Sequence, residues 1–113
     1  MSSHSHIVFA IYQPRLGTNG RLEALIKRHV PALRSLGYAT GRPVVLLRSP
    51  VDQSYVEIFE WTSADAASKA HFDPRVLALW DELGEVATYK TLSQLAEAGE
   101  MFPHFEVVDA LIA

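Results

Sequence analysis

The stretch that decides the fold is EIFEWTSADAASKAHFDP, residues 57–74. Its first part is rich in aromatic and β-branched residues and belongs to a predicted strand over residues 54–62. Because successive side chains in a strand point to opposite faces, one face carries Tyr55, Glu57, Phe59 and Trp61. The other face carries Val56, Ile58 and Glu60. Each face therefore carries apolar side chains and one carboxylate. Only one of the two carboxylates can face a given cavity.

The second part of the stretch predicts a helix in two pieces. Thr62 or Ser63 caps a first piece made mostly of alanine and serine, which ends at His71. Asp73 caps the second piece, and Pro74 suits its first turn. The second piece places an apolar stripe at helical spacing, with Gly84 as its expected end: Val76, Leu79, Trp80 and Leu83.

Elements on the N-terminal side of this stretch follow the same two periodicities. Residues 6–13 predict a first strand that stops at Pro14. A helix follows with Asn19 as N-cap and Gly37 as its end, and Pro31 predicts a kink or a restart inside it. The inward side of this helix carries Leu22, Leu25, Ile26, His29, Leu33 and Leu36.

The remaining elements complete the expected order. Residues 44–49 predict a second strand, joined to residues 54–62 by a short turn, and residues 86–92 predict a fourth strand. The order is strand, helix, strand, strand, split helix, strand and tail. We therefore expect an α+β fold, the ferredoxin-like βαββαβ plait, with a four-stranded antiparallel sheet and helices on one face only. The whole chain, 1–113, would be one domain, with its core in 6–92.

A sheet covered on one face leaves an apolar second face to bury. The first strand points Ile7, Phe9 and Ile11 to one side, and burying such a face against a second copy would be worth several kcal/mol. We therefore expect a homodimer in which two sheets pack face to face as an α+β barrel. The tail, 93–113, would then be placed to cross to the partner and cover a sheet edge.

Composition excludes several classes of protein. The net charge is −3 and the chain has no cysteine, so nucleic acid, a membrane surface, disulfides and thiolate metal sites all lack support. No apolar run reaches the length of a membrane helix, and residues 1–6 lack the pattern of a signal peptide. These features indicate a cytoplasmic protein.

Three segments resemble one known superfamily: the strand end EIFEW, the helix TSADAASKAHFDP and the later Leu79-Trp80 pair. They are similar to dimeric α+β barrel proteins, and in particular to antibiotic-biosynthesis-monooxygenase-type domains, over about residues 6–92. The resemblance implies a pocket between sheet and helices in each subunit. It also implies cofactor-independent oxygenation of aromatic polyketides or quinols, haem degradation, or isomerisation and decarboxylation of small molecules.

His71 and Glu57 are the candidate catalytic residues. His71 shares a helix side with two alanines, so small neighbours could leave a cavity where its imidazole acts as a base toward a phenol or enol. Alternatively it caps the helix end by bonding a carbonyl group or Glu57, or it simply packs in the core. Glu57 would work beside it as a buried carboxylate, or pair with Arg48 across the hairpin.

Aromatic residues supply the candidate substrate-binding wall. Trp61, Tyr55, Tyr12 and Tyr89 could hold a flat ligand, with Arg48 at the rim, or they could be core or dimer interface. Trp80 and His29 are expected in the core. No metal cluster or phosphate-binding glycine loop can be recognised, so neither a metal nor another cofactor is predicted.

The sequence thus favours a protein that binds a small aromatic or apolar molecule, as a monooxygenase-like enzyme without a cofactor. Two alternatives stay open. One is a non-catalytic binding or structural dimer with a filled pocket. The other is a haem-binding or haem-degrading protein with His71 or His29 as the axial ligand.

Overall fold

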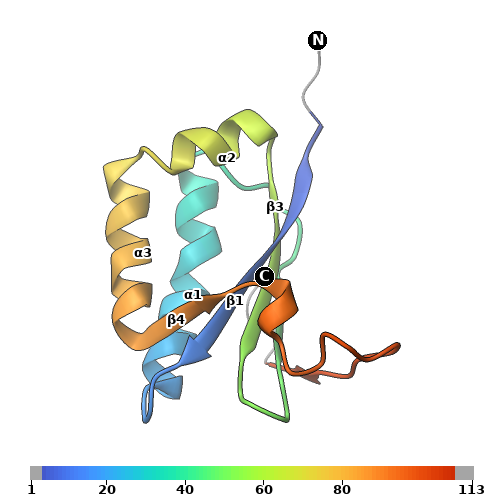
Figure 1. Ribbon diagram of the computed structural model, residues 1–113. Coiled ribbons are helices and arrows are strands. Elements are labelled where there is room, and N and C mark those ends of the chain that lie inside the picture. The colour runs from blue at the N-terminus through green and yellow to red at the C-terminus, as the bar shows by residue number, and fades with distance from the viewer. Residues whose placement is uncertain (1–3, 109–113) are drawn as a thin grey trace.

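A computed structural model describes residues 4–108, which form three α-helices on one face of an antiparallel five-stranded sheet (Figure 1). The sheet order is β4-β1-β3-β2-β5. The strands are β1 (His6–Pro14), β2 (Val45–Arg48), β3 (Tyr55–Trp61), β4 (Ala87–Lys90) and β5 (Glu106–Val107). The helices are α1 (Asn19–Ser35), α2 (Ala64–Ala70) and α3 (Pro74–Val86), followed after β4 by a short 3-10 helix, η1 (Leu92–Gln94).

The expected mixed α+β architecture is confirmed, but the sheet has five strands and not four. The extra strand, β5, comes from the tail and pairs antiparallel with β2, Leu47 opposite Val107. The edge of a sheet leaves backbone N–H and C=O groups unpaired. Here β5, from the same chain, pairs with some of these groups on β2. The last five residues, 109–113, lie outside the described part of the tail.

Local capping signals set the start of both short helices. The Ser63 side chain accepts a hydrogen bond from the Ala66 backbone N–H, and the Asp73 side chain accepts one from the Arg75 N–H. Both caps were expected from the sequence, because a cap depends only on residues within one turn. At α1 the cap position is Thr18, one residue before the predicted Asn19.

Tertiary packing overrides two helix signals. The helix α1 continues through Pro31 as one element to Ser35, and α3 continues past Gly84 to Val86. Val86 is fully buried against the sheet, so the extra half turn of α3 adds apolar burial that a stop at Gly84 would lose. The end of α1 does follow its glycine, since Gly37 adopts a φ of +83° that favours glycine.

The main core lies between the helices and the sheet. The helices α1 and α3 pack against each other and cover one face of the sheet (Figure 1). The aromatic residues Tyr12, Tyr55, Phe59 and Trp61 belong to the buried cluster on this side. Its most buried apolar members include Leu22, Ile26, Val30, Leu33, Val76, Leu83 and Val86 from the helices and Tyr12, Tyr55 and Phe59 from the sheet. No helix within residues 4–108 is long and apolar enough to span a membrane.

The opposite face of the sheet is only partly covered. The segment after β4 lies on this side (Figure 1), and Leu95 packs with Ile11 and Val56 in a second, smaller apolar cluster. Phe9 and Val45 remain 47% and 44% exposed, on the two strands that flank β3. The chain itself therefore covers the part of this face around Ile11 and Val56 and leaves the part around Phe9 and Val45 open. We call the second part the open half of the sheet.

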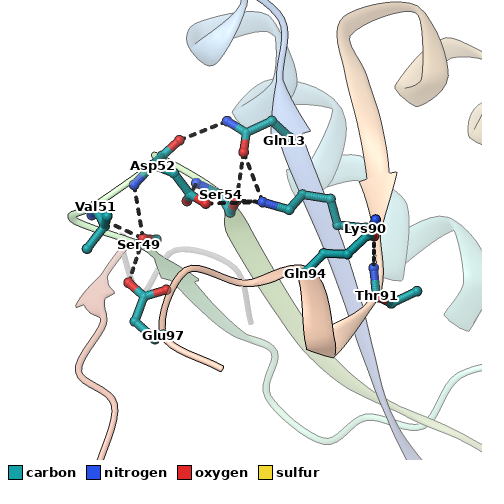
Figure 2. A network of polar contacts seen from close by, with 9 residues as sticks. All are labelled: Gln13, Ser49, Val51, Asp52, Ser54, Lys90, Thr91, Gln94 and Glu97. Carbon is teal, nitrogen blue, oxygen red and sulfur yellow. Dashed lines mark hydrogen bonds and ion pairs between the residues drawn. The ribbon is translucent and has the colours of Figure 1, made fainter. Parts of the chain in front are cut away.

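A lysine holds the end of the sheet to the β2–β3 turn (Figure 2). The Lys90 ammonium on β4 donates to Gln13 Oε1 at 3.1 Å, Ser54 Oγ at 2.8 Å and Asp52 Oδ2 at 3.1 Å. Burial alone would raise the pKa of Asp52, but the Ser54 backbone N–H and the Lys90 ammonium lower it to about 2. Because the lysine is mostly buried, these bonds are weakly screened.

We expect Lys90→Met to destabilise the protein by about 1–3 kcal/mol near neutral pH, because it leaves the Asp52 carboxylate without its cation. Ionised Asp52 contributes stability above its usual pKa of 3.8, and this is lost as the pH falls toward about 2. The difference in the free energy of unfolding between variant and wild type should shrink over that pH range. Urea unfolding at several pH values measures this free energy, and Lys27→Met, which alters an exposed lysine, is the control.

Candidate functional site

A buried hydrogen-bond chain joins the sheet to α1. The Glu57 carboxylate on β3 is fully buried and accepts a hydrogen bond from the Tyr12 hydroxyl at 2.7 Å. The His29 Nδ1 lies 2.9 Å from Glu57 Oε1 and 3.1 Å from Oε2. The carboxylate charge is thus shared between a phenol of β1 and an imidazole of α1, as a buried acid requires.

The chain continues to α3 through an indole. The Trp80 Nε1–H donates to His29 Nε2 at 2.9 Å. An indole N–H can only donate, so Nε2 is the unprotonated nitrogen and Nδ1 carries the hydrogen that is donated to Glu57. Both ring nitrogens of His29 are therefore engaged inside the protein. The predicted core role of His29 agrees with this geometry, and no lone pair is left for an axial bond to haem iron.

A cavity of about 420 Å³ lies above this chain, between the sheet and the C-terminal part of the helical layer. We name it the helix-side cavity. Its walls are Val8, Ala10, Tyr12, His29, Phe59, Trp61, His71, Leu77, Trp80, Asp81 and Tyr89. Glu57 is absent from the wall and acts on the cavity only through Tyr12 and His29. A mostly apolar, aromatic cavity of this size is typical of small-molecule sites.

His71 caps the end of its helix and also lines the helix-side cavity. Its Nδ1 lies 2.7 Å from the Ala67 carbonyl oxygen, so it donates there and caps the end of α2. Its ring packs edge-on against Trp80 at 4.9 Å and lines the helix-side cavity. With Nδ1 as the donor, Nε2 of the neutral ring is unprotonated, and it has no hydrogen-bond partner among residues 4–108.

The space in the cavity does not come from the alanines of α2. Ala64 and Ala67, which share the side of the helix that carries His71, do not line the cavity: Ala64 is exposed and Ala67 packs against the core. The small side chain on the floor is Ala10 of β1, which lies opposite Glu57 in the sheet register. Small residues in α2 instead bring that helix close to the core.

Four of the seven predicted site residues meet at the cavity wall, and Glu57 lies behind it. The four are His71, Trp61, Tyr12 and Tyr89. Tyr89 packs its ring 5.5 Å from that of Tyr12 and donates its hydroxyl hydrogen to the Trp80 carbonyl. The wall also includes Trp80 and Asp81. The position of Trp80 in the α3 stripe predicts a core residue, and it does pack against the core, but that position does not reveal that its indole reaches His29.

Arg48 and Tyr55 lie elsewhere. The sheet register places Arg48 opposite Tyr55 and Leu46 opposite Glu57, so the expected Arg48 to Glu57 contact does not form. Arg48 instead pairs with Glu106 of β5 at 3.1 Å. The Tyr55 hydroxyl donates to Glu23 of α1, at the end of the core away from His71.

The electrostatics of the site disfavour phenolate. Burial, together with the nearby Glu57 carboxylate, raises the pKa of Tyr12 well above its usual value. Burial also raises the pKa of Tyr89 to about 12, with the charges of Glu57 and Asp81 adding to the effect. Both hydroxyls are therefore neutral donors across the physiological range. No group of three metal-ligating side chains occurs within the described residues.

Comparison with known proteins supports the fold. No family model matches the chain, and no curated protein matches it either. Among solved structures, a NIPSNAP family protein from Agrobacterium tumefaciens is similar, with a TM-score of 0.53 and 17% sequence identity. The match covers 80% of this chain and 83% of that chain. At this identity the similarity shows the fold alone: a mixed α+β protein with a ferredoxin-like arrangement.

We expect all four tyrosines to titrate above pH 10 in the native protein. Burial raises the pKa values of Tyr12, Tyr55 and Tyr89, and the hydrogen bond to Asp73 raises that of Tyr38. Their unfolded pKa is about 10, so the stability linked to their neutral forms is complete below pH 10 and is lost as the pH rises toward 12.

Phenolate absorbance near 295 nm, followed against pH in native and urea-unfolded protein, checks this expectation. The native curve should lie at higher pH than the unfolded one throughout. A native component that coincides with the unfolded curve would contradict the buried placement of that tyrosine.

Proposed function

We propose that the chain binds a small aromatic or apolar molecule in the helix-side cavity. The supporting observation is that His71, whose Nε2 has no hydrogen-bond partner among residues 4–108, lines a cavity walled by Tyr12, Trp61 and Trp80. Aromatic rings offer flat contact area, and the neutral Tyr12 and Tyr89 hydroxyls add no charge to the wall. A planar phenol or enol fits this combination of surfaces.

We further propose that His71 takes a proton from the hydroxyl or the activated carbon of this ligand. Removal of that proton gives an electron-rich anion that can itself reduce molecular oxygen. In a monooxygenation of an activated CH₂ group, the carbon becomes C=O, one oxygen atom of O₂ enters the product and the other leaves as water. The substrate supplies all the electrons, so the reaction balances without a redox cofactor, as in antibiotic-biosynthesis-monooxygenase-type domains.

His29 and Glu57 serve this site as positioning residues. The hydrogen bond from Trp80 to His29 fixes the indole that contacts the His71 ring. Glu57 in turn fixes His29. A rigid wall of this kind lowers the entropy cost of orienting a flat ligand against one base.

His71→Ala should lower oxygen consumption with an anthrone-type phenol or enol by about 10²–10⁴-fold, because the base is removed. The affinity for the ligand should fall much less than the rate of oxygen consumption. Quenching of the fluorescence of Trp61 and Trp80 measures this affinity. His104→Ala, which alters an exposed histidine far along the chain, is the matched control and should retain full activity.

The readouts separate the proposals from one another. Saturable quenching without oxygen uptake by the wild type would contradict the enzyme proposal and leave a binding module. The absence of any quenching by planar phenols, together with a retained fold by circular dichroism, would contradict the cavity as a binding site. A Soret band that appears on addition of haem and is lost in His71→Ala would favour the haem-binding alternative.

We also propose that the chain forms a homodimer through the open half of the sheet. A row of apolar side chains crosses three strands there, since Phe9 lies opposite Ile58 and Ile58 lies opposite Val45. Ile7 continues the surface and is 47% exposed. A contiguous apolar patch on one sheet face is typical of an interface, and packing two copies of it would form an α+β barrel.

Sedimentation should give a dimer for the wild type at micromolar concentration and a monomer for Ile7→Glu, because a carboxylate in an apolar interface loses its hydration. Ile7 does not line either cavity, so the substitution tests the interface alone. Val51→Glu changes an exposed valine in the β2–β3 turn and should remain dimeric. A monomeric wild type would overturn the proposal.

A further inference from the structure

A second cavity lies on the opposite face of the sheet. It has a volume of about 410 Å³ and lies between the sheet and the segment that follows β4. We name it the tail-side cavity. Its walls are Phe9, Leu47, Val56, Leu92, Ser93, Leu95, Glu97, Ala98, Pro103 and Phe105. Apart from Ser93 and Glu97, every one of these side chains is apolar.

Glu97 is the ionisable residue in the wall of this cavity. The residue is only 2% exposed, and its Oε1 has no hydrogen-bond partner within the described chain. Nearly all buried polar atoms in folded proteins have a partner, because an unpaired one loses its hydration without compensation. Glu97 lines an apolar cavity, and its Oε1 is buried without a partner, so a donor is missing beside this cavity.

Two nearby donors, Ser49 and Lys90, are already engaged elsewhere. The Ser49 hydroxyl donates to Glu97 Oε2 at 2.6 Å, and its oxygen already accepts the backbone N–H groups of Val51 and Asp52 (Figure 2). A serine has a single hydrogen to donate, so it serves one oxygen only. The adjacent cation, Lys90, is engaged by Gln13, Ser54 and Asp52.

We propose that the tail-side cavity binds an apolar molecule with a primary ammonium head, which donates to Glu97 Oε1. An ammonium group supplies hydrogen-bond donors and also compensates the carboxylate charge, which a neutral alcohol does not. The apolar body of the ligand lies against Leu47, Val56 and Phe105. This site is separate from the helix-side cavity and does not depend on the function proposed there, because the sheet lies between the two.

The test uses n-hexylamine as the probe and 1-hexanol as its uncharged counterpart. Backbone amide shifts of the full chain, recorded during titration, should change at Ser49, Leu95 and Ala98, with saturation for the amine and weaker binding of the alcohol. Glu97→Gln should weaken amine binding by about 10-fold or more and leave the alcohol unchanged. The glutamine carbonyl can still accept from Ser49, so the fold should persist.

Two further variants make the result specific. Glu100→Gln removes an exposed carboxylate three residues away and should leave amine binding unchanged. Ala98→Phe should fill the cavity and abolish binding of both probes.

Equal amine affinity in wild type and Glu97→Gln, or shifts confined to the helix-side cavity, would overturn the proposal. It would also be overturned if the Ile7→Glu chain bound no amine and Glu97→Gln weakened dimerisation instead, since a second copy would then be the occupant.

Discussion

The structure depends on one buried carboxylate in the centre of the sheet. Glu57 lies on the middle strand, faces the helices and has no exposed surface. A buried charge of this kind is tolerated only when donors surround it, and Tyr12 and His29 provide them from β1 and α1. Trp80 of α3 then fixes the far side of the imidazole. Four elements distant in sequence are thereby held in one arrangement, since a shift of any of them would break a hydrogen bond of this chain.

The hydrogen bonds that link Glu57, His29 and Trp80 also hold the wall of the helix-side cavity in place. A wall residue that is held by a hydrogen bond cannot rotate to fill a neighbouring gap, and Trp80 and His29 are held in this way. The cavity persists because Ala10 is too small to fill it from below. His71 differs from these residues, since one nitrogen caps α2 and the other is free of protein partners among residues 4–108. The site thus combines a rigid wall with one accessible base.

The two faces of the sheet are used differently. The helix face contains a polar network that is satisfied throughout, whereas the tail face contains one carboxylate, Glu97, with an unpaired oxygen. The tail reaches this position because Leu95 packs into the apolar cluster on β1 and β3 and β5 pairs with β2. The part of this face that the tail leaves open is the part proposed to meet a second copy.

The sequence by itself determined the features that depend on near neighbours. Alternation along residues 54–62 placed Glu57 and Glu60 on opposite faces, and the caps at Ser63 and Asp73 form as expected. The sequence also indicated that His71 would lie beside a cavity or cap its helix, and it does both. Periods of 2.0 and 3.6 residues and single-turn hydrogen bonds are local properties, so they can be recognised without the fold.

Only the tertiary structure decided which of these residues meet. Strand register placed Arg48 opposite Tyr55 and away from Glu57, and helix packing brought the Trp80 indole to His29 and carried α3 beyond Gly84. Alternation and a short turn restrict the register, because a one-residue slip would move every side chain of a strand to the other face. They do not say which residues of the neighbouring strand and helices each side chain meets. The position of Glu97 is the clearest case, because the burial of a tail residue depends on where the whole tail packs.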